Sequence, residues 1–127
     1  RHQLKMRQTL DLIGKNPDQE IIVSSFNLAS LVDAHDCRPD FPLMYNTESD
    51  QSITDIHKVN AAHSFLHGFC LPIDIIDLEI VGLLRDHRKC IGVYTCNSEM
   101  QINKALQLGV DILISDFPQK ALIIRDR

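Results

Sequence analysis

Polar and aromatic side chains recur at the points where short apolar segments of this sequence end. Four groups follow such segments: Ser24, Ser25 and Phe26; Tyr45, Asn46 and Thr47; Tyr94, Thr95 and Asn97; and Ser115 with Asp116. Hydroxyl, amide and carboxylate groups orient polar ligands through hydrogen bonds, and aromatic rings line the pockets that hold them. If the segments are parallel strands, these groups meet at one edge of a sheet, where α/β proteins bind ligands. Turns and helix caps also favour polar residues, so the spacing alone leaves both interpretations open.

The sequence contains no complete catalytic motif. It has no Gly-rich phosphate loop, no GxSxG nucleophile and no HExxH metal motif. His63 and His67 are four residues apart, but a strand predicted over 65–71 prevents them from sharing a helix face. Asp116 alone cannot hold a hard divalent cation, because such ions need several oxygen ligands. We therefore assign no catalytic residue and no metal ligand to this chain.

Apolar segments alternate with amphipathic segments and define the elements that position these groups. The predicted strands are 20–27, 41–46, 64–73, 90–97 and, after Gly109, the apolar run 112–114. Each is followed by a predicted helix, and a helix carrying Leu4, Leu10 and Ile13 precedes the first strand. The unbroken run 112–114 predicts a strand that is covered on both faces. This repeat, at intervals of about 20 to 25 residues, predicts an α/β fold with a parallel sheet or a (β/α)8 barrel.

Several residues mark where the helices begin and end. They are Asn27 and Asp74 as predicted N-caps, Ser98 with Gln101 as a capping box, Gly109 as a left-handed C-cap, and Pro118 as the first residue of the last helix. The helix after Asp74 is expected to turn Ile76, Ile80, Leu83 and Leu84 inward, and the helix after Ser98 is expected to bury Ile102, Ala105 and Leu106.

The composition is that of one globular domain. The 127 residues are 44% hydrophobic and 24% charged, with a formal net charge of -4. An acidic chain without a Lys/Arg stripe argues against a nucleic-acid partner. No apolar run of about 18 residues is present, so no membrane span is predicted. The cysteines are expected to be free thiols in a reducing compartment, which favours the cytoplasm and leaves the bacterial envelope open. They are Cys37, Cys70, Cys90 and Cys96.

Two stretches of the sequence resemble a known family. Residues 92–118, "GVYTCNSEMQINKALQLGVDILISDFP", resemble the closing part of the glycerophosphodiester phosphodiesterases, which reads roughly v-x-W-T-x-N, a helix, then G-V-D-x-I-x-T-D-x-P. Residues 21–27, "IIVSSFN", resemble an earlier strand of that family that ends in Ser-Phe. Tyr94 stands where the family more often has Trp, and Ser115 where it more often has Thr. Both differences retain the aromatic ring or the hydroxyl group.

The resemblance implies a fold and a chemistry. The fold is a (β/α)8 TIM barrel, of which this chain supplies about the last five βα units, with residues 1–127 as the carboxyl-terminal part of a single domain. The chemistry is hydrolysis of glycerophosphodiesters to glycerol 3-phosphate and an alcohol, with a divalent cation, Ca²⁺ or Mg²⁺, in the complete domain. The family takes its catalytic histidines and metal carboxylates from motifs that this sequence lacks. This fragment is therefore expected to hold no metal and to be inactive alone.

The resemblance also places five residues of this chain near the substrate. By position, Phe26 and Tyr94 would be walls for the glycerol and alcohol groups. Ser25, Asn97 and Asp116 would orient polar groups of the substrate or support the residues that do so. For Tyr94, packing inside the barrel is the alternative interpretation.

Two other functions stay open at this point. The chain could be a non-catalytic half-barrel used for binding or assembly, or part of another phosphate-binding barrel, because one fold hosts many reactions. Parallel strands that do not close into a barrel leave unpaired edges and an uncovered face. We therefore expect the half-barrel to self-associate through these edges when it stands alone.

Overall fold

The computed structural model describes residues 22–127 as five strands, each followed by a helix. In chain order the elements are β1 (Val23–Ser25), α2 (Leu28–Cys37), β2 (Leu43–Asn46), α3 (Ile53–Ala62), β3 (Gly68–Pro72), α4 (Leu78–Asp86), β4 (Cys90–Tyr94), α5 (Glu99–Leu108), β5 (Ile112–Leu113) and α6 (Pro118–Arg125). The predicted alternation of strands and helices is confirmed. The helix predicted around Leu4, Leu10 and Ile13 lies outside the described residues.

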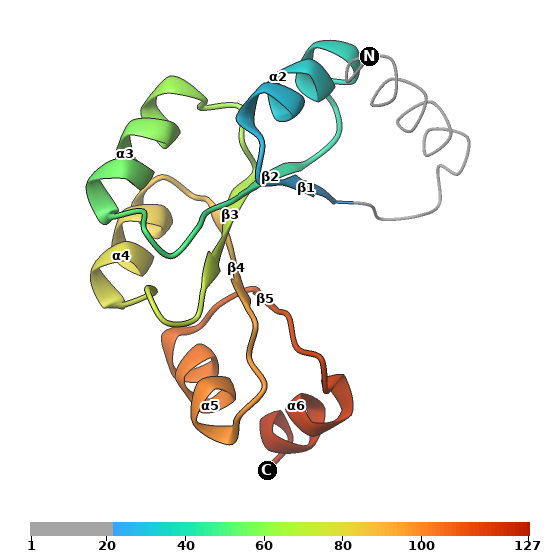
Figure 1. The fold of residues 1–127 in the computed structure, drawn as a ribbon, viewed down its shortest axis with the longest axis vertical. Coiled ribbons are helices and arrows are strands. Elements are labelled where there is room, and N and C mark those ends of the chain that lie inside the picture. Colours follow the sequence, from blue (N-terminus) through green and yellow to red (C-terminus); the bar gives the residue numbers. More distant parts are fainter. Residues whose placement is uncertain (1–21) are drawn as a thin grey trace.

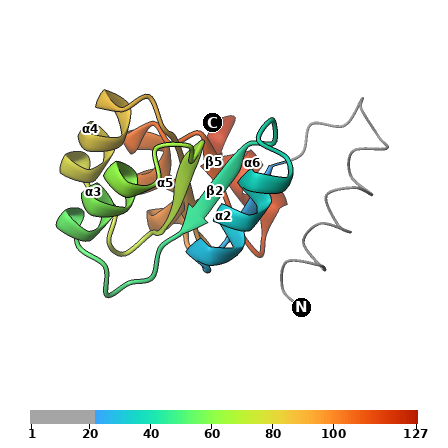
Figure 2. The same cartoon turned by 90° about the horizontal axis from the view of Figure 1, so that it is seen from above.

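All five strands are parallel and lie in one sheet in the order β1-β2-β3-β4-β5. Figure 1 shows the strands crossing the middle of the molecule, with α3 and α4 covering one side of them. Viewed from above, α3 and α4 lie to the left of β2, and α2 and α6 lie to its right (Figure 2). The observed strands are shorter than the predicted ones, and the residues lost from them include apolar ones such as Phe41, Phe65 and Ile114.

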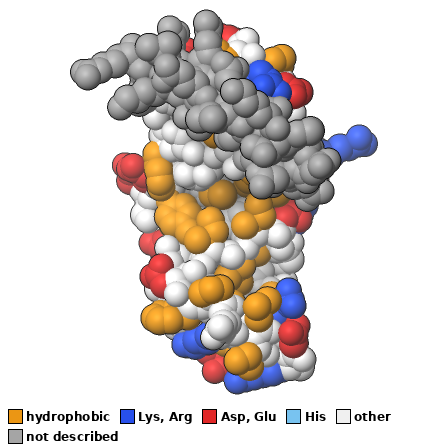
Figure 3. Space-filling view, turned by 90° about the vertical axis from the view of Figure 1, so that its right-hand side faces the viewer, with side chains coloured by type: hydrophobic (Ala, Val, Ile, Leu, Met, Phe, Trp, Pro, Cys, Tyr) orange, Lys and Arg blue, Asp and Glu red, His pale blue; other side chains and the backbone are white. Residues whose placement is uncertain are grey.

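The sheet packs one face against the helices, and the central residues of its other face, Met44 and Cys70, are also buried. Alternate strand residues point to opposite faces. The side chains that pack with the helices in the hydrophobic core are Leu43 and Tyr45 of β2, Phe69 and Leu71 of β3, and Ile91 and Val93 of β4. The register places Ser24, Met44, Cys70, Gly92 and Tyr94 on the opposite face. The side of the molecule turned away from α3 and α4 exposes hydrophobic side chains along much of its length (Figure 3).

Most helix boundaries follow the predicted capping residues. Asn27 accepts a hydrogen bond from the backbone N–H of Ser30 at 3.2 Å. Ser98 and Gln101 form the predicted capping box at the start of α5, and Pro118 is the first residue of α6. Gly109 ends α5 with φ 71°, in the left-handed region where a side chain is unfavourable.

The predicted start of α4 was wrong. Asp77, not Asp74, caps this helix and accepts a hydrogen bond from the Ile80 N–H at 2.9 Å. A turn closed by the Ile75 N–H and the Pro72 carbonyl, at 3.2 Å, occupies the residues after β3. The helix therefore begins at Leu78. Ile76 is buried as predicted, but it precedes the helix.

The predicted burial of the last strand on both faces was also wrong. Ile112 and Leu113 are only half-buried, and Ile114 is 43% exposed and lies outside the strand. Within residues 22–127, β5 pairs with β4 alone and forms an edge of the sheet. Its second edge therefore has no strand beside it in this part of the chain. Leu106 of α5, predicted to be buried, is 38% exposed for a related reason: it lines an apolar groove between α5, β5 and α6.

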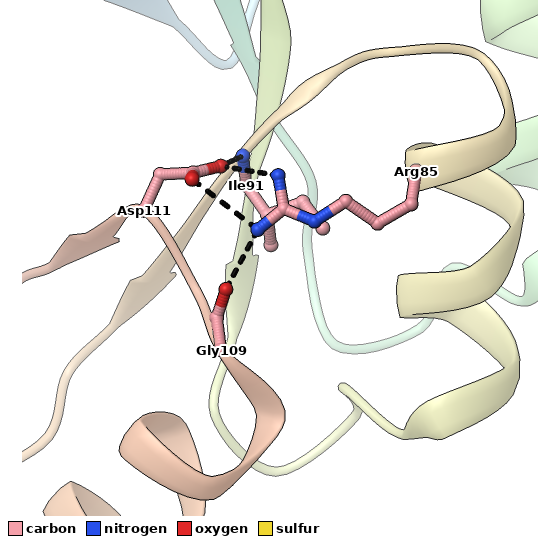
Figure 4. A network of polar contacts seen from close by, with 4 residues as sticks. All are labelled: Arg85, Ile91, Gly109 and Asp111. Atoms are coloured by element: carbon pink, nitrogen blue, oxygen red, sulfur yellow. Dashed lines mark hydrogen bonds and ion pairs between the residues drawn. The ribbon is translucent and has the colours of Figure 1, made fainter.

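A polar network fixes the amino end of β5 to β4 and α4 (Figure 4). The Asp111 carboxylate accepts hydrogen bonds from both terminal nitrogens of Arg85, at 2.8 and 3.2 Å, and from the Ile91 N–H at 2.8 Å. Arg85 also donates to the Gly109 carbonyl at 2.6 Å. Burial acts to raise the pKa of Asp111, but the hydrogen bonds from Arg85 and Ile91 outweigh it and hold the pKa below its usual range.

We expect Asp111→Asn to destabilise the protein by about 1–2 kcal/mol at neutral pH, because a charge-assisted network at a partly exposed position is lost. The folded-state pKa of Asp111 is lowered, so its contribution is present above the ordinary carboxyl pKa and disappears as the pH falls through the folded value. The difference in free energy of unfolding between wild type and variant should therefore shrink below about pH 4.

Urea unfolding at several pH values measures this difference. Asp126→Asn is the matched control, because within residues 22–127 the Asp126 carboxylate pairs with its exposed neighbour Arg125 alone. That change should alter stability by no more than about 0.5 kcal/mol. An Asp111→Asn effect that stays constant between pH 7 and pH 3 would contradict the assignment of the network to the ionised carboxylate.

Candidate functional site

The carboxyl ends of the strands bring side chains from distant strands into contact. The rings of Phe26, after β1, and Tyr94, at the end of β4, meet edge to face with their centroids 6.0 Å apart and an interplanar angle of 84°. In a flat sheet, β1 and β4 would be about 14 Å apart, because two strands lie between them. The sheet therefore curves, and the two rings lie on its concave side.

The Tyr94 side chain reaches over the end of β3. Its hydroxyl donates a hydrogen bond to the backbone carbonyl of Thr47, just beyond β2. Burial raises the pKa of Tyr94, and the carboxylates of Glu48 and Asp74 raise it further. Tyr94 is therefore a neutral hydrogen-bond donor at physiological pH, with its ring fixed at both ends by Thr47 and Phe26.

Asn97 joins the ends of β4 and β5. Its amide nitrogen donates to the Asp116 carboxylate at 2.9 Å. Its amide oxygen accepts from the Asp116 N–H at 2.9 Å and from the Ser115 hydroxyl at 3.3 Å. The Ser115 oxygen in turn accepts from the Phe117 N–H at 2.9 Å. We call Asn97, Ser115 and Asp116 the Asn97 clasp.

The backbone of Asn97 is held as firmly as its side chain. Its N–H donates to the Gln101 side-chain oxygen at 3.0 Å, and its carbonyl accepts from the Lys120 ammonium at 3.0 Å. Gln101 is the capping-box residue of α5, and Lys120 lies in the first turn of α6. Two helices thus position Asn97 at the edge where the sequence predicts a ligand.

The structure brings four of the five predicted site residues together in two pairs, Phe26 with Tyr94 and Asn97 with Asp116. Ser25 lies apart from them. It pairs in register with Tyr45, so it faces the helix-covered side, and its hydroxyl accepts a hydrogen bond from the Asn27 N–H at 3.0 Å. This local contact shapes the turn into α2.

Two polar residues on the concave side, Ser24 and Asn46, were not among the five site residues predicted from the sequence. Asn46 donates to the Ser24 hydroxyl at 3.5 Å, linking the ends of β2 and β1. The register pairs Ser24 with Met44, on the face opposite the helix-packed core, whereas Ser25 faces the core. The alternation of strand residues would have favoured Ser24 over Ser25, if the position of the apolar residue Val23 had been used to fix the register.

No metal site is formed by the residues that the structure describes. Carboxylates near the concave edge belong to Glu48, Asp74 and Asp116, but no three His, Cys, Asp or Glu side chains in residues 22–127 gather closely enough to hold an ion. In the same part of the chain, no helix has the length and apolar character needed to cross a membrane.

Solved structures show which fold the sheet belongs to. A phosphodiesterase from Oleispira antarctica, solved in complex with the product sn-glycerol-3-phosphate, superposes with a TM-score of 0.86 at 22% identity over 99% of this chain and 51% of its own. A glycerophosphodiester phosphodiesterase from Thermotoga maritima superposes with a TM-score of 0.68 at 19% identity over 95% of this chain and 54% of its own. These neighbours are TIM barrels, so the five-stranded sheet is a partial (β/α)8 barrel, as predicted.

Sequence comparisons identify relatives of the chain. A glycerophosphodiester phosphodiesterase from Bacillus altitudinis is 30% identical over 109 residues, which are 86% of this chain and 44% of that protein. One from Bacillus subtilis is 27% identical over 110 residues, which are 84% of this chain and 37% of that protein. The chain thus spans less than half the length of these relatives. The model of the glycerophosphoryl diester phosphodiesterase family matches residues 1–120, and the chain therefore belongs to that family.

Proposed function

We propose that this chain is the carboxyl-terminal part of the barrel of a phosphodiesterase that hydrolyses glycerophosphodiesters to glycerol 3-phosphate and an alcohol. Family membership supports the reaction type. The observation that carries the proposal to this chain is the Phe26–Tyr94 pair, which places two aromatic rings in contact at the concave edge from strands that are not neighbours. The four free cysteines suit a reducing compartment, so we include a cytoplasmic location in the proposal.

The two rings form an apolar wall for the carbon skeleton of the substrate. Phe26 is 52% exposed, although a large apolar side chain favours burial, and its ring is therefore available to pack against a ligand. The Tyr94 hydroxyl is occupied by the Thr47 carbonyl, which leaves its ring face as the contacting surface. The Asn97 clasp keeps the β4 and β5 ends in place beside this wall.

We propose that residues 22–127 position the substrate and do not act as the acid, base or metal ligands of the reaction. We propose that a divalent cation, Ca²⁺ or Mg²⁺, and the proton-transferring histidines belong to the part of the protein outside this chain. Within residues 22–127, the carboxylates near the edge do not gather into a cation site. The role of this chain is to position the substrate and shape its pocket.

We expect Tyr94→Ala to raise KM for glycerophosphodiesters about tenfold, because one wall of the pocket and its edge-to-face contact are lost. Tyr94→Phe retains the ring and loses only the hydrogen bond to Thr47. It should therefore change KM by about threefold at most. Steady-state release of glycerol 3-phosphate by the whole polypeptide that carries this chain provides the measurement. Equal effects of the two changes would contradict the role of the ring as a wall.

The intact mass of the natural polypeptide separates this proposal from a non-catalytic half-barrel. A polypeptide about twice as long as this chain, with glycerol 3-phosphate release from glycerophosphocholine or glycerophosphoethanolamine, supports the enzyme. A polypeptide no longer than this chain, inactive and oligomeric, would favour the binding or assembly module. The exposed apolar residues Ile114, Phe117 and Leu122 would then be candidate contact residues.

A further inference from the structure

The loop between α4 and β4 contains a conformation that arginine does not favour. Arg88 has φ 56°, in the left-handed region. The Lys89 N–H donates to the Leu84 carbonyl at 2.9 Å, and the His87 N–H donates to the Leu83 carbonyl at 3.3 Å. This helix ending usually has glycine at the left-handed position, as α5 has Gly109. Residues other than glycine that hold a strained backbone conformation cluster at functional sites.

Arg88 lines two shallow cavities that are wide open to solvent at the amino edge of the sheet, the edge opposite the Phe26–Tyr94 pair. Their volumes are about 370 Å³ and 400 Å³, and His67 and Lys89 line both of them as well. His67 directly precedes β3, and Lys89 directly precedes β4. Three cationic or protonatable side chains from two adjacent strand starts therefore border the same space.

The carboxylates at this edge are already paired. Asp40 lies against Arg38 at 3.4 Å, and Asp111 lies against Arg85 at 2.8 Å. The Lys89 ammonium donates to the Ser64 and Leu66 carbonyls at 2.9 and 2.6 Å, and burial lowers its pKa. Across residues 22–127, neither Arg88 nor Lys89 forms an ion pair with a carboxylate. Arg88 and Lys89 thus add positive charge to cavities that Asp40 and Asp111 also line, and both of these carboxylates are already neutralised by other arginines.

We propose that Arg88, Lys89 and His67 form a binding site for a small soluble oxyanion of the phosphate class at the amino edge of the sheet. The Arg88 guanidinium presents a planar fork of donors that matches a tetrahedral oxyanion. Lys89 supplies a fixed charge whose position is set by two carbonyls. The ligand is a free phosphate or a phosphorylated small molecule, because each cavity has the volume of a small molecule.

Arg88→Gly tests this proposal, because it affects stability and binding in opposite directions. We expect the variant of the whole polypeptide to unfold about 1–3 °C higher than wild type in potassium chloride, since glycine relieves the left-handed strain. In inorganic phosphate at equal ionic strength, the wild type should gain several degrees and Arg88→Gly at most a third of that gain. Arg88→Lys keeps the charge but loses the planar fork of donors, so it should retain only part of the gain, but more than Arg88→Gly. Gly109→Ala is the control, with a lower unfolding temperature and an unchanged phosphate response.

Nuclear magnetic resonance of the His67 ring provides the direct readout. Titration with inorganic phosphate should shift its signals in the wild type, and the shift should be lost in Arg88→Gly. Equal phosphate responses of wild type and Arg88→Gly would overturn the site, and so would an Arg88→Lys variant that loses the response completely. Arg88-dependent sedimentation with phosphatidylglycerol vesicles, without a response to inorganic phosphate, would overturn the assignment to a soluble ligand.

Discussion

Gly68→Ala is expected to destabilise the protein by more than about 3 kcal/mol, which is a large fraction of the roughly 5–15 kcal/mol that stabilises a typical domain. A Cβ atom at position 68 would lie 2.1 Å from the backbone carbonyl oxygen of Cys90. Gly68 pairs in register with Cys90, so the contact could be relieved only by separating β3 from β4. No rotation of a side chain removes a clash with backbone atoms. Thermal unfolding followed by circular dichroism measures the effect.

The chain contains two matched controls for this change. Gly82 lies within α4, and a methyl group added there would meet no atom beyond its own helix within 4 Å, so Gly82→Ala should stabilise the protein by about 0.5–1 kcal/mol. A Cβ atom at Gly92 would meet the Cys70 sulfur at 2.8 Å, and a side chain has some freedom to move. Gly92→Ala should therefore have an intermediate cost. A Gly68→Ala protein as stable as Gly82→Ala would show that β3 and β4 do not approach as described.

Asn97→Asp is expected to lower kcat/KM for glycerophosphodiester hydrolysis by about 10- to 100-fold at neutral pH, if the proposed function is correct. The change replaces the amide donor that faces the Asp116 carboxylate with a second negative charge, 2.9 Å from it in the present geometry. Two adjacent carboxylates repel, so the ends of β4 and β5 should separate beside the Tyr94 wall. Activity assays and thermal unfolding of the same preparations measure the two consequences.

The pH dependence distinguishes repulsion from simple loss of a contact. As the pH falls, one carboxyl group of the pair takes up a proton and again donates a hydrogen bond to the other. The unfolding temperature of Asn97→Asp relative to wild type should therefore recover between pH 7 and pH 4, whereas the deficit of Asn97→Ala should stay constant. Stability is the deciding readout, because it does not depend on the proposed activity. Parallel pH profiles for both variants would argue against a repulsive Asn97–Asp116 contact.

The sequence correctly predicted the features that depend on residues close together in the chain. The Ser98–Gln101 capping box, the left-handed Gly109 and the first-turn Pro118 each determine one helix end through nearby backbone groups, and each was confirmed. The order of strands and helices followed from hydrophobic periodicity alone. Asp74 and Asp77 both suit an N-cap, and the choice depended on a turn after Pro72 that periodicity does not reveal.

Features that depend on tertiary geometry were beyond sequence reasoning. The exposure of Ile114 follows from the position of β5 at the sheet edge, which its apolar composition does not indicate. The Phe26–Tyr94 contact follows from sheet curvature, although the family resemblance had already selected both residues. The link between Ser24 and Asn46 required the pairing register of β1 and β2.

The order of strands in the sheet equals their order in the chain, and this bears on synthesis at the ribosome. Each new strand pairs with the strand made just before it, so no strand must wait for a later segment to be inserted beside it. Contacts between consecutive βα units span short stretches of sequence, and such contacts form early and quickly. The sheet can therefore grow one βα unit at a time outside the exit tunnel, because its newest edge strand can pair with the next strand as that strand emerges.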